Sequence, residues 1–268
     1  MRLSGFASSQ NLDPAHRPSW LSPGDKRRMD PLTLRACQTV DKLLANRRLS
    51  PDCGMVFACA YGSIISTLRF VDSIRDHGDG SASPTPFTSS VHNATGGSLS
   101  QLLDLHGPST TLSEGNVSTS AALRWAWCQL YSQRCPQVLL VCGEEHHPWS
   151  QRTVTGLTDL LWPVADGMSA CLLEPLSGNQ DLVWRPGEHP ASRCLDNGGM
   201  TSADRRRLAA AAQGQQRLIA PELLGGWWPT CTLAALPSLD ELQGQALQVR
   251  ERDGLVNCSW WLGPATAG

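Results

Sequence analysis

The sequence predicts an α/β fold in which helices cover a buried, partly parallel sheet. Three short and continuous apolar runs, each flanked by turn residues, indicate buried strands at residues 137–143, 54–60 and 168–174. The segments between them carry apolar residues at helical spacing. This alternation of strands and helices is typical of a layered α/β structure, because helices must cover both faces of a parallel sheet.

The remaining elements follow from periodicity and turn chemistry. Residues 1–30 contain a short first strand and then an irregular segment rich in Pro, Ser and Gly. Asp30 and Pro31 are typical of the N-cap and the first position of a helix. A β-branched run predicts a short strand at 110–113. Helices are predicted at residues 31–46, 62–77, 97–105 and 117–133.

The character of the sequence changes after residue 175. Residues 1–175 form one compact α/β unit in this interpretation, and residues 176–268 are too short for an independent domain of the same kind. We therefore expect the C-terminal portion to be reduced and to pack on the same core. Its predicted elements are strands at 182–184 and 254–262 and a helix at 202–218.

The composition excludes several classes of protein. The chain has 268 residues and a formal net charge of -2, from 22 Lys and Arg against 24 Asp and Glu, so a polybasic nucleic-acid surface or an acidic tail is not its main feature. Hydrophobic residues make up 41% of the chain, enough for an ordinary globular core. No apolar run approaches the roughly 20 residues of a membrane helix, and residues 1–10 lack the pattern of a secretory signal. We therefore expect a cytoplasmic protein.

The ten cysteines include no C-x-x-C pair. Several lie in apolar runs, where a free cysteine behaves as a small hydrophobe, so buried thiols are favoured over disulfides or a zinc site. Residues 142–147, with the sequence CGEEHH, are a candidate metal cluster. Adjacent residues of a strand point to opposite faces and do not easily converge on one ion, so we expect a polar loop at the edge of the sheet. No metal or cofactor is predicted.

Three segments occur in a specific order: SSVHNATGGSLSQLLDLHGPSTTLSEGNVSTSAAL at 89–123, VLLVCGEE at 138–145 and ADGMSACLLE at 165–174. Together they resemble the N-terminal half of a β-ketoacyl synthase of the thiolase fold. In that family a Gly-Pro turn leads into a strand across the dimer interface, and a tight turn then presents a cysteine at the start of a buried helix. A D-G-x-x-A strand closes the half. Gly107-Pro108, the strand at 110–113 and Asp166-Gly167 match this order.

Two shorter motifs narrow the resemblance. YGS at 61–63 and SVHNA at 90–94 are similar to the short, chain-length-factor type of ketosynthase-like protein found in aryl polyene and related polyketide clusters. The resemblance covers residues 50–175 well, the start loosely and the C-terminal third hardly at all. It implies a thiolase-like layered fold whose N-terminal half is well represented and whose C-terminal half is truncated.

Asn116 stands where the resemblance places the nucleophilic cysteine. Condensation needs a thiolate, which is a good nucleophile and leaving group and is stabilised by a helix N-terminus. A carboxamide has no acid–base chemistry near neutral pH. The two histidines that assist decarboxylation in the family lie in its C-terminal half, and here His189 is the only histidine after residue 175 and matches neither family motif. The resemblance therefore implies no independent condensation. The plain physical role of Asn116 is to cap the helix that begins at Val117.

Other polar groups near this turn have structural interpretations. Ser118 and Ser120 lie in the same turn, but a serine nucleophile needs a histidine and an orienting carboxylate, and no G-x-S-x-G elbow surrounds either serine. We expect capping or buried hydroxyls instead. His92 is expected to point into the interior or the subunit interface and to order its loop by hydrogen bonding.

The resemblance as a whole implies a catalytically silent ketosynthase homologue, a chain length factor, that pairs with a full-length, active β-ketoacyl synthase. The partner would cover the unpaired edge of strand 110–113. The tryptophans of the C-terminal third would also need cover: Trp227, Trp228, Trp260 and Trp261. Two alternatives stay open: a stand-alone acyl-thioester transferase or hydrolase that uses a serine or another cysteine, and a subunit that only stabilises the ketosynthase.

This interpretation assigns roles to two sets of residues. The acyl carrier protein would be an indirect partner. The basic cluster Arg205, Arg206 and Arg207 is either a solvated helix face or a contact for this acidic protein. The candidates for the interface or the acyl tunnel are His92, Asn93, Thr110, Thr111, Leu112, Ser113, Asn116 and Ser118.

Overall fold

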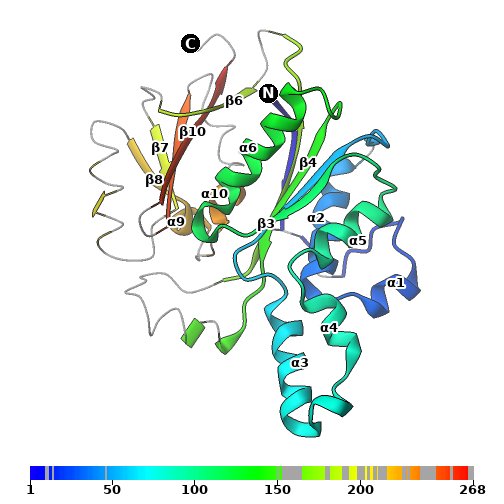
Figure 1. Cartoon of the computed structure of the whole chain (residues 1–268). Coiled ribbons are helices and arrows are strands. Elements are labelled where there is room, and N and C mark those ends of the chain that lie inside the picture. The colour runs from blue at the N-terminus through cyan, green and yellow to red at the C-terminus, as the bar shows by residue number, and fades with distance from the viewer. Residues whose placement is uncertain are drawn as a thin grey trace.

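Figure 1 shows a computed structural model of the chain. The structure describes residues 1–9, 12–13, 15–45, 47–149, 151–152, 165–178, 182–188, 193–197, 203, 206–207, 210, 216–224, 228, 230–235, 246–253 and 256–264. In the N-terminal part the strands are β1 (Arg2–Ser8), β2 (Gly54–Ala58), β3 (Ser109–Leu112), β4 (Val138–Glu144) and β5 (Gly167–Glu174). In the C-terminal part they are β6 (Leu182–Pro186), β7 (Arg193–Asp196), β8 (Gln216–Ile219), β9 (Leu247–Asp253) and β10 (Val256–Pro264).

The sheet consists of two halves with the same topology. Taken from the outer edge inward, the N-terminal half is ordered β3-β2-β4-β5-β1 and the C-terminal half β8-β7-β9-β10-β6. In each half the three outer strands are parallel and the two inner pairings are antiparallel. The halves join at one residue pair, Arg2 with Val183. The described residues of the C-terminal half thus form five strands, although this half is short in sequence, and the sequence analysis located only β6 and β10 of them.

The helix α6 (Ser118–Tyr131) lies between the two half-sheets (Figure 1). Its buried Leu123 and Ala126 belong to one apolar cluster with Val56 and Leu140 of the first half-sheet and Trp260 of the second. The short helix α10 (Cys231–Ala234) contributes to the same cluster. The C-terminal portion therefore packs on the core of the N-terminal one, and the start of α6 is enclosed by both.

Two helices cover the opposite face of the first half-sheet. They are α2 (Pro31–Leu44) and α5 (Ala94–Leu102), and they pack on Met55, Phe57 and Leu139, which alternate along their strands with residues of the inner cluster. Since alternate residues of a strand point to opposite faces, both faces must be apolar, which explains the continuous apolar runs of the sequence. The layered α/β fold predicted from them is confirmed.

The predicted cap of α2 is also confirmed. The Asp30 carboxylate accepts a hydrogen bond from the Thr33 backbone N–H at 3.0 Å and another from the Thr33 hydroxyl at 2.6 Å, and Pro31 occupies the first helical position. Asp30 also accepts from the Ser63 hydroxyl at 3.3 Å. One buried carboxylate thereby joins the start of α2 to the start of α3 (Ile64–His77).

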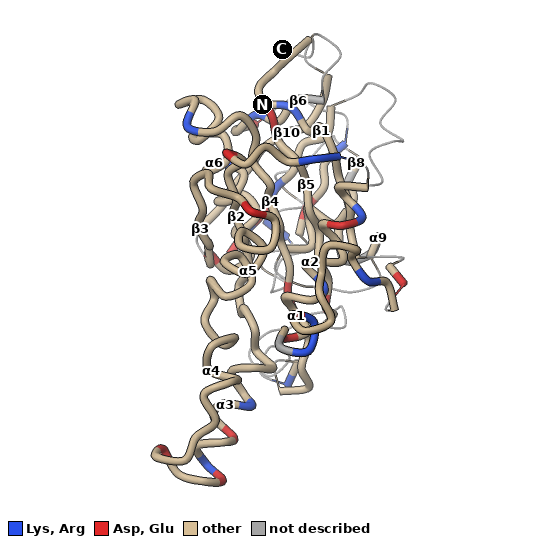
Figure 2. The backbone as a smooth tube through the Cα atoms, turned by 90° about the vertical axis from the view of Figure 1, so that its right-hand side faces the viewer, with Lys and Arg blue, Asp and Glu red and all other residues tan. Residues whose placement is uncertain are grey.

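The helices α3 and α4 (Pro84–Ser90), joined by the turn η1 (Asp79–Ser81), extend away from the rest of the chain in both views (Figures 1 and 2). Their rings Phe70 and Phe87 are in contact, with centroids 5.1 Å apart. Ser66 is the only buried residue of α3, and Val71 is 52% exposed. The amphipathic helix is confirmed, but much of its apolar face lies on the surface.

Several sequence predictions need correction. The predicted helix at 202–218 is wrong at its end, because residues 216–218 belong to β8 and their backbone pairs with β7 in the sheet. The short helix α1 (Pro23–Arg28), capped by Ser22, forms where irregular chain was expected, and α9 (Ala220–Leu224) forms where no element was predicted. The helix α5 begins three residues earlier than predicted. These boundaries depend on tertiary contacts that short-range periodicity does not contain.

Three C-terminal tryptophans that the structure describes are buried within the chain itself and do not need a partner to bury them. Trp228, Trp260 and Trp261 are 3%, 1% and 5% exposed, because they pack between the half-sheets or against β6 and β9, while Trp227 lies outside the described residues. All ten cysteines are free thiols, and eight are buried as predicted; Cys128 is exposed and Cys258 half-buried. Among the described residues, no helix is both long enough and apolar enough to span a bilayer.

Candidate functional site at the start of helix α6

The turn between β3 and α6 is the position at which the sequence resemblance places a nucleophile. It consists of one 3-10 turn, η2 (Gly115–Val117), followed directly by α6. Gly115 has φ = +56°, a left-handed conformation that favours glycine. Asn116 is only 2% exposed and lies between the two half-sheets. The turn is therefore a buried site that both halves of the fold enclose.

Asp253, at the end of β9, contacts this turn directly. Its Oδ2 accepts a hydrogen bond from the Asn116 backbone N–H at 2.9 Å. A Cβ atom added at Gly115 would lie 1.7 Å from the same oxygen, so the close approach requires glycine for lack of a side chain as well as for its φ. An acidic side chain of the C-terminal half thus accepts a hydrogen bond from a backbone N–H at the start of the helix.

Glu251, two residues earlier on the same face of β9, contacts another donor of the helix start. It accepts a hydrogen bond from the Ser120 backbone N–H at 3.0 Å and others from the hydroxyls of Ser120 and Thr232. Glu251 is 1% exposed, and burial raises its pKa to about 7 although the bonds from Ser120 and Thr232 act in the opposite direction. A third contact comes from Asn197, whose amide donates to the Asn116 carbonyl at 3.4 Å.

The side chain of Asn116 does not cap α6, contrary to the sequence prediction. Neither η2 nor α6 has a side-chain cap bond at its N-terminus, and within the described residues the Asn116 Nδ2 atom is buried without a hydrogen-bond partner. The acceptors that Asn116 was expected to supply come instead from Asp253 and Glu251, because β9 runs directly past the turn. The Ser118 hydroxyl donates to the Gly115 carbonyl at 2.7 Å and accepts from the Glu114 N–H at 2.9 Å.

Thiols and serines near the turn are held in structural roles. Ser118 and Ser120 both make hydrogen bonds that order the turn, as predicted. Cys59, in the loop after β2, is fully buried, and burial raises the pKa of its thiol well above the ordinary value. A high thiol pKa suppresses the thiolate and therefore its nucleophilicity.

The candidate metal cluster after β4 organises backbone instead. Glu144 accepts hydrogen bonds from the N–H groups of Ala60 and Tyr61, and Glu145 accepts one from Ile65 N–H at 2.6 Å at the start of α3. Burial raises the pKa of Glu144 to about 8 and that of Glu145 to about 7. In the described part of the chain, no three His, Cys, Asp or Glu side chains gather in an arrangement that would hold a metal ion.

The other candidate interface residues lie along the outer edge of the sheet. Strand β3 is an edge strand and pairs only with β2 among the described strands; Thr110, Thr111 and Leu112 are half-buried on it, and Ser113 is exposed. His92 and Asn93 are also exposed. The His92 ring lies beside Gly62 on the surface of the chain and not in its interior, because the loop before α5 remains outside the packed layers.

The structure describes two of the three arginines of the predicted basic cluster. Arg205 lies outside the described residues, and Arg206 and Arg207 are exposed. Arg207 lines a cavity of about 240 Å³, together with Arg250 and Arg252 of β9 and five further residues: Glu188, Glu251, Asn257, Cys258 and Ser259. The arginines of β9 were missed, although the alternation in LQVRERD is a strand signal that could have located them.

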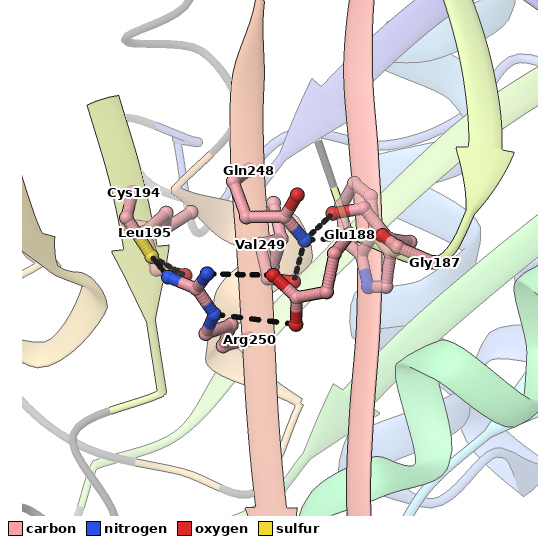
Figure 3. Close-up of polar contacts among 8 residues, drawn as sticks. Gly187, Glu188, Cys194, Leu195, Gln248, Val249 and Arg250 are labelled. Carbon is pink, nitrogen blue, oxygen red and sulfur yellow. Dashed lines mark hydrogen bonds and ion pairs between the residues drawn. The ribbon is translucent and has the colours of Figure 1, made fainter. Parts of the chain in front are cut away.

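Figure 3 shows the polar contacts of Arg250, which lines this cavity, and of Gln248 on the same strand. The Arg250 guanidinium donates to Glu188 at 2.6 Å and to the Cys194 sulfur at 2.9 Å. On the same face of β9, the Gln248 amide donates to the carbonyls of Trp260 at 3.0 Å and Gly187 at 3.2 Å. Arg250 and Arg252 of β9 line this cavity together with Glu251, and Glu251 and Asp253 also bond to the start of α6.

Comparison with known proteins identifies the class of fold. Residues 6–213 match the family described as "Beta-ketoacyl synthase, N-terminal domain", which extends well beyond the segments that carried the resemblance. No curated protein shows a significant sequence match.

Solved structures share the fold over nearly the whole chain at low sequence identity. The ishigamide ketosynthase/chain length factor has a TM-score of 0.75 and 17% identity, covering 98% of this chain and 99% of the other. A type II acyl carrier protein in complex with its ketosynthase bound to the hexaketide has a TM-score of 0.75 and 11% sequence identity, with the same coverage of both chains. A ketosynthase in complex with its chain length factor from Xenorhabdus doucetiae gives 0.62 and 16%, again covering 98% and 99%. Because the sequence identities are so low, these similarities show only that the chain shares the thiolase-like fold.

Proposed function

The chain belongs to the β-ketoacyl synthase family, and on this premise we propose that it is a non-catalytic subunit, a chain length factor. It pairs with an active β-ketoacyl synthase in polyketide or aryl polyene-type biosynthesis and limits the length of the acyl chain. One observation carries the proposal. The residue at the nucleophile turn is Asn116, and its backbone N–H is already bonded to Asp253.

The chemistry of the turn supports the absence of catalytic activity in this chain. An amide side chain cannot form an acyl thioester, and the nearby serine hydroxyls are engaged in ordering the helix start. An oxyanion formed during acyl transfer needs free N–H donors aimed at it. Here the N–H groups of Asn116 and Ser120 already donate to Asp253 and Glu251 of the same chain, and the Asp253 carboxylate repels a second negative charge. The catalytic cysteine and histidines therefore come from the partner.

The partner follows from the edge strand. Strand β3 leaves one edge of the first half-sheet without a neighbouring strand among the described residues, and natural proteins seldom leave such an edge open. Two of the similar structures are of a ketosynthase with a chain length factor. A ketosynthase of the same fold presents an equivalent edge, and pairing the two edges makes a continuous sheet across a heterodimer.

Co-expression with a candidate ketosynthase tests the pairing. We expect a stable one-to-one complex by size-exclusion chromatography and light scattering. In β3 the carbonyls of Pro108 and Leu112 bond to β2, so by the alternation of a parallel ladder the backbone N–H of Thr111 faces outward. Thr111→Pro removes that donor and should weaken the complex, while Thr111→Val keeps it and should not. Equal complex formation by both variants, each folded by circular dichroism, argues against pairing through this edge.

Product analysis tests the role in the complex. Substitution of bulky residues at the interface should change the length of the product while the partner's acylation stays intact. A change of yield without a change of length indicates a subunit that only stabilises the ketosynthase. Turnover of an acyl carrier thioester by the purified chain alone, lost on substitution of one side chain, indicates the alternative transferase or hydrolase.

A further inference from the structure

Acidic groups lie near the start of α6. Asp253 and Glu251 approach from β9, and Glu114 precedes the turn. A cation that faces the same region is Arg124 of α6, which acts on Cys258 together with Glu251 and Glu114. The Asp253 carboxylate makes this environment the opposite of the electropositive one that activates a cysteine, because a neighbouring anion raises the pKa of a thiol.

The helix N-terminus itself would favour an anion at residue 116. Its unpaired N–H groups carry roughly half a positive charge and stabilise a negative group in the first turn. In this chain Asp253 takes that position, since it accepts the N–H of residue 116 at 2.9 Å and lies against Gly115 without space for a side chain between them. A thiolate at residue 116 would meet an existing carboxylate that already uses the favourable donor.

We infer that Asp253 is a positioning residue that keeps the nucleophile turn inactive, independently of which side chain stands at residue 116. Asp253 occupies the backbone donor and places a negative charge beside the turn. Glu251 holds the following turn of the helix through Ser120 in the same way. The inference rests on the proposed function for the location of the nucleophile turn, and it deepens that proposal: restoring a cysteine alone does not restore a reactive thiolate.

The test is the pKa of a thiol introduced by Asn116→Cys. The thiolate is titrated by its ultraviolet absorbance, and the same titration of Asn116→Ser is subtracted to remove the contribution of the native cysteines. Asp253→Asn is then added to both. Asparagine can still accept the residue-116 N–H but carries no charge, so it separates the electrostatic role from a structural one.

The decisive comparison is between the single variant N116C and the double variant that adds D253N. Loss of the Asp253 charge should lower the pKa of the introduced thiol by about 1 unit or more, which is about a tenfold gain in thiolate at neutral pH. Asp76→Asn on exposed α3 is the matched control for removing a carboxylate and should leave that pKa unchanged. Equal thiol pKa values with and without the Asp253 charge would overturn the inference.

Folding of the variants is checked by circular dichroism and thermal melting. If D253N does not fold, Asp253→Ser removes the charge with a smaller side chain and gives the same comparison. All titrations use the chain alone. A failure of heterodimer formation therefore bears on the proposed function, whereas an unchanged thiol pKa bears on the role of Asp253.

Discussion

Substitution of Gly115 by alanine is the most direct test of the packing at the start of α6. The residue has φ = +56°, which costs an alanine about 1–2 kcal/mol. The added Cβ would also lie 1.7 Å from the Asp253 oxygen, so Asp253 must move and lose its bond to Asn116 N–H. A lost hydrogen bond to a charged group costs about 1.5–3 kcal/mol. We therefore expect Gly115→Ala to lower the free energy of unfolding by about 2.5–5 kcal/mol.

Gly62→Ala provides the matched control. Gly62 has φ = +61°, and the three atoms nearest to its Cβ would all belong to the ring of the exposed His92, at 3.3 Å or more, which can move aside. Gly62→Ala should therefore show the conformational cost alone, about 1–2 kcal/mol. Both free energies are measured by urea denaturation followed by tryptophan fluorescence.

A double-mutant cycle identifies the source of the additional cost. In an Asp253→Ala background the collision is absent, so Gly115→Ala should cost no more than Gly62→Ala does. If Gly115→Ala and Gly62→Ala are equally destabilising in the native background, or if Asp253→Ala leaves the cost of Gly115→Ala unchanged, the described contact between β9 and the turn is wrong.

Three further measurements address other features. Burial raises the folded-state pKa of Glu251 to about 7, above its unfolded value, so its contribution to stability is present at acidic pH and is lost as pH rises through about 7; a thermal melting series should show this fall, and Glu251→Gln should flatten part of it. Asp30→Ala should cost about 1–2 kcal/mol by urea denaturation, and more than Ser22→Ala at the exposed cap of α1. Iodoacetamide under native conditions should modify Cys128 and then Cys258 before the buried thiols, by peptide mass mapping. Rapid modification of a buried thiol, a larger effect of Ser22→Ala, or an unaltered pH profile would each contradict the corresponding contact.

The fold of the N-terminal half could be predicted because its signals are local. Strands β2, β4 and β5 are buried on both faces, so they are continuous apolar runs that stand out in the sequence. The cap of α2 is also local, since Asp30 and Thr33 are three residues apart. Such features need no knowledge of the rest of the chain.

The C-terminal half was harder because its signals depend on distant partners. Strand β9 carries Arg250, Glu251, Arg252 and Asp253, a charged run that would be unusual in a buried strand without compensation. The compensation comes from Glu188 and from Ser120, which is 131 residues away in the sequence. The repeated strand order of the two halves is likewise a property of pairing and has no counterpart in a repeated sequence.

The same distance explains why the start of α6 was predicted to within one residue, whereas the capping role predicted for Asn116 was wrong. A residue of this type before a helix usually caps it, and the prediction followed that local rule. In the folded chain the N-terminus of α6 is reached by Asp253, which satisfies the donor and supplies the negative charge that the helix dipole favours. Under the proposed function, in which Asn116 stands at the nucleophile position, Asp253 supplies at the helix start the negative charge that a thiolate would supply in an active ketosynthase.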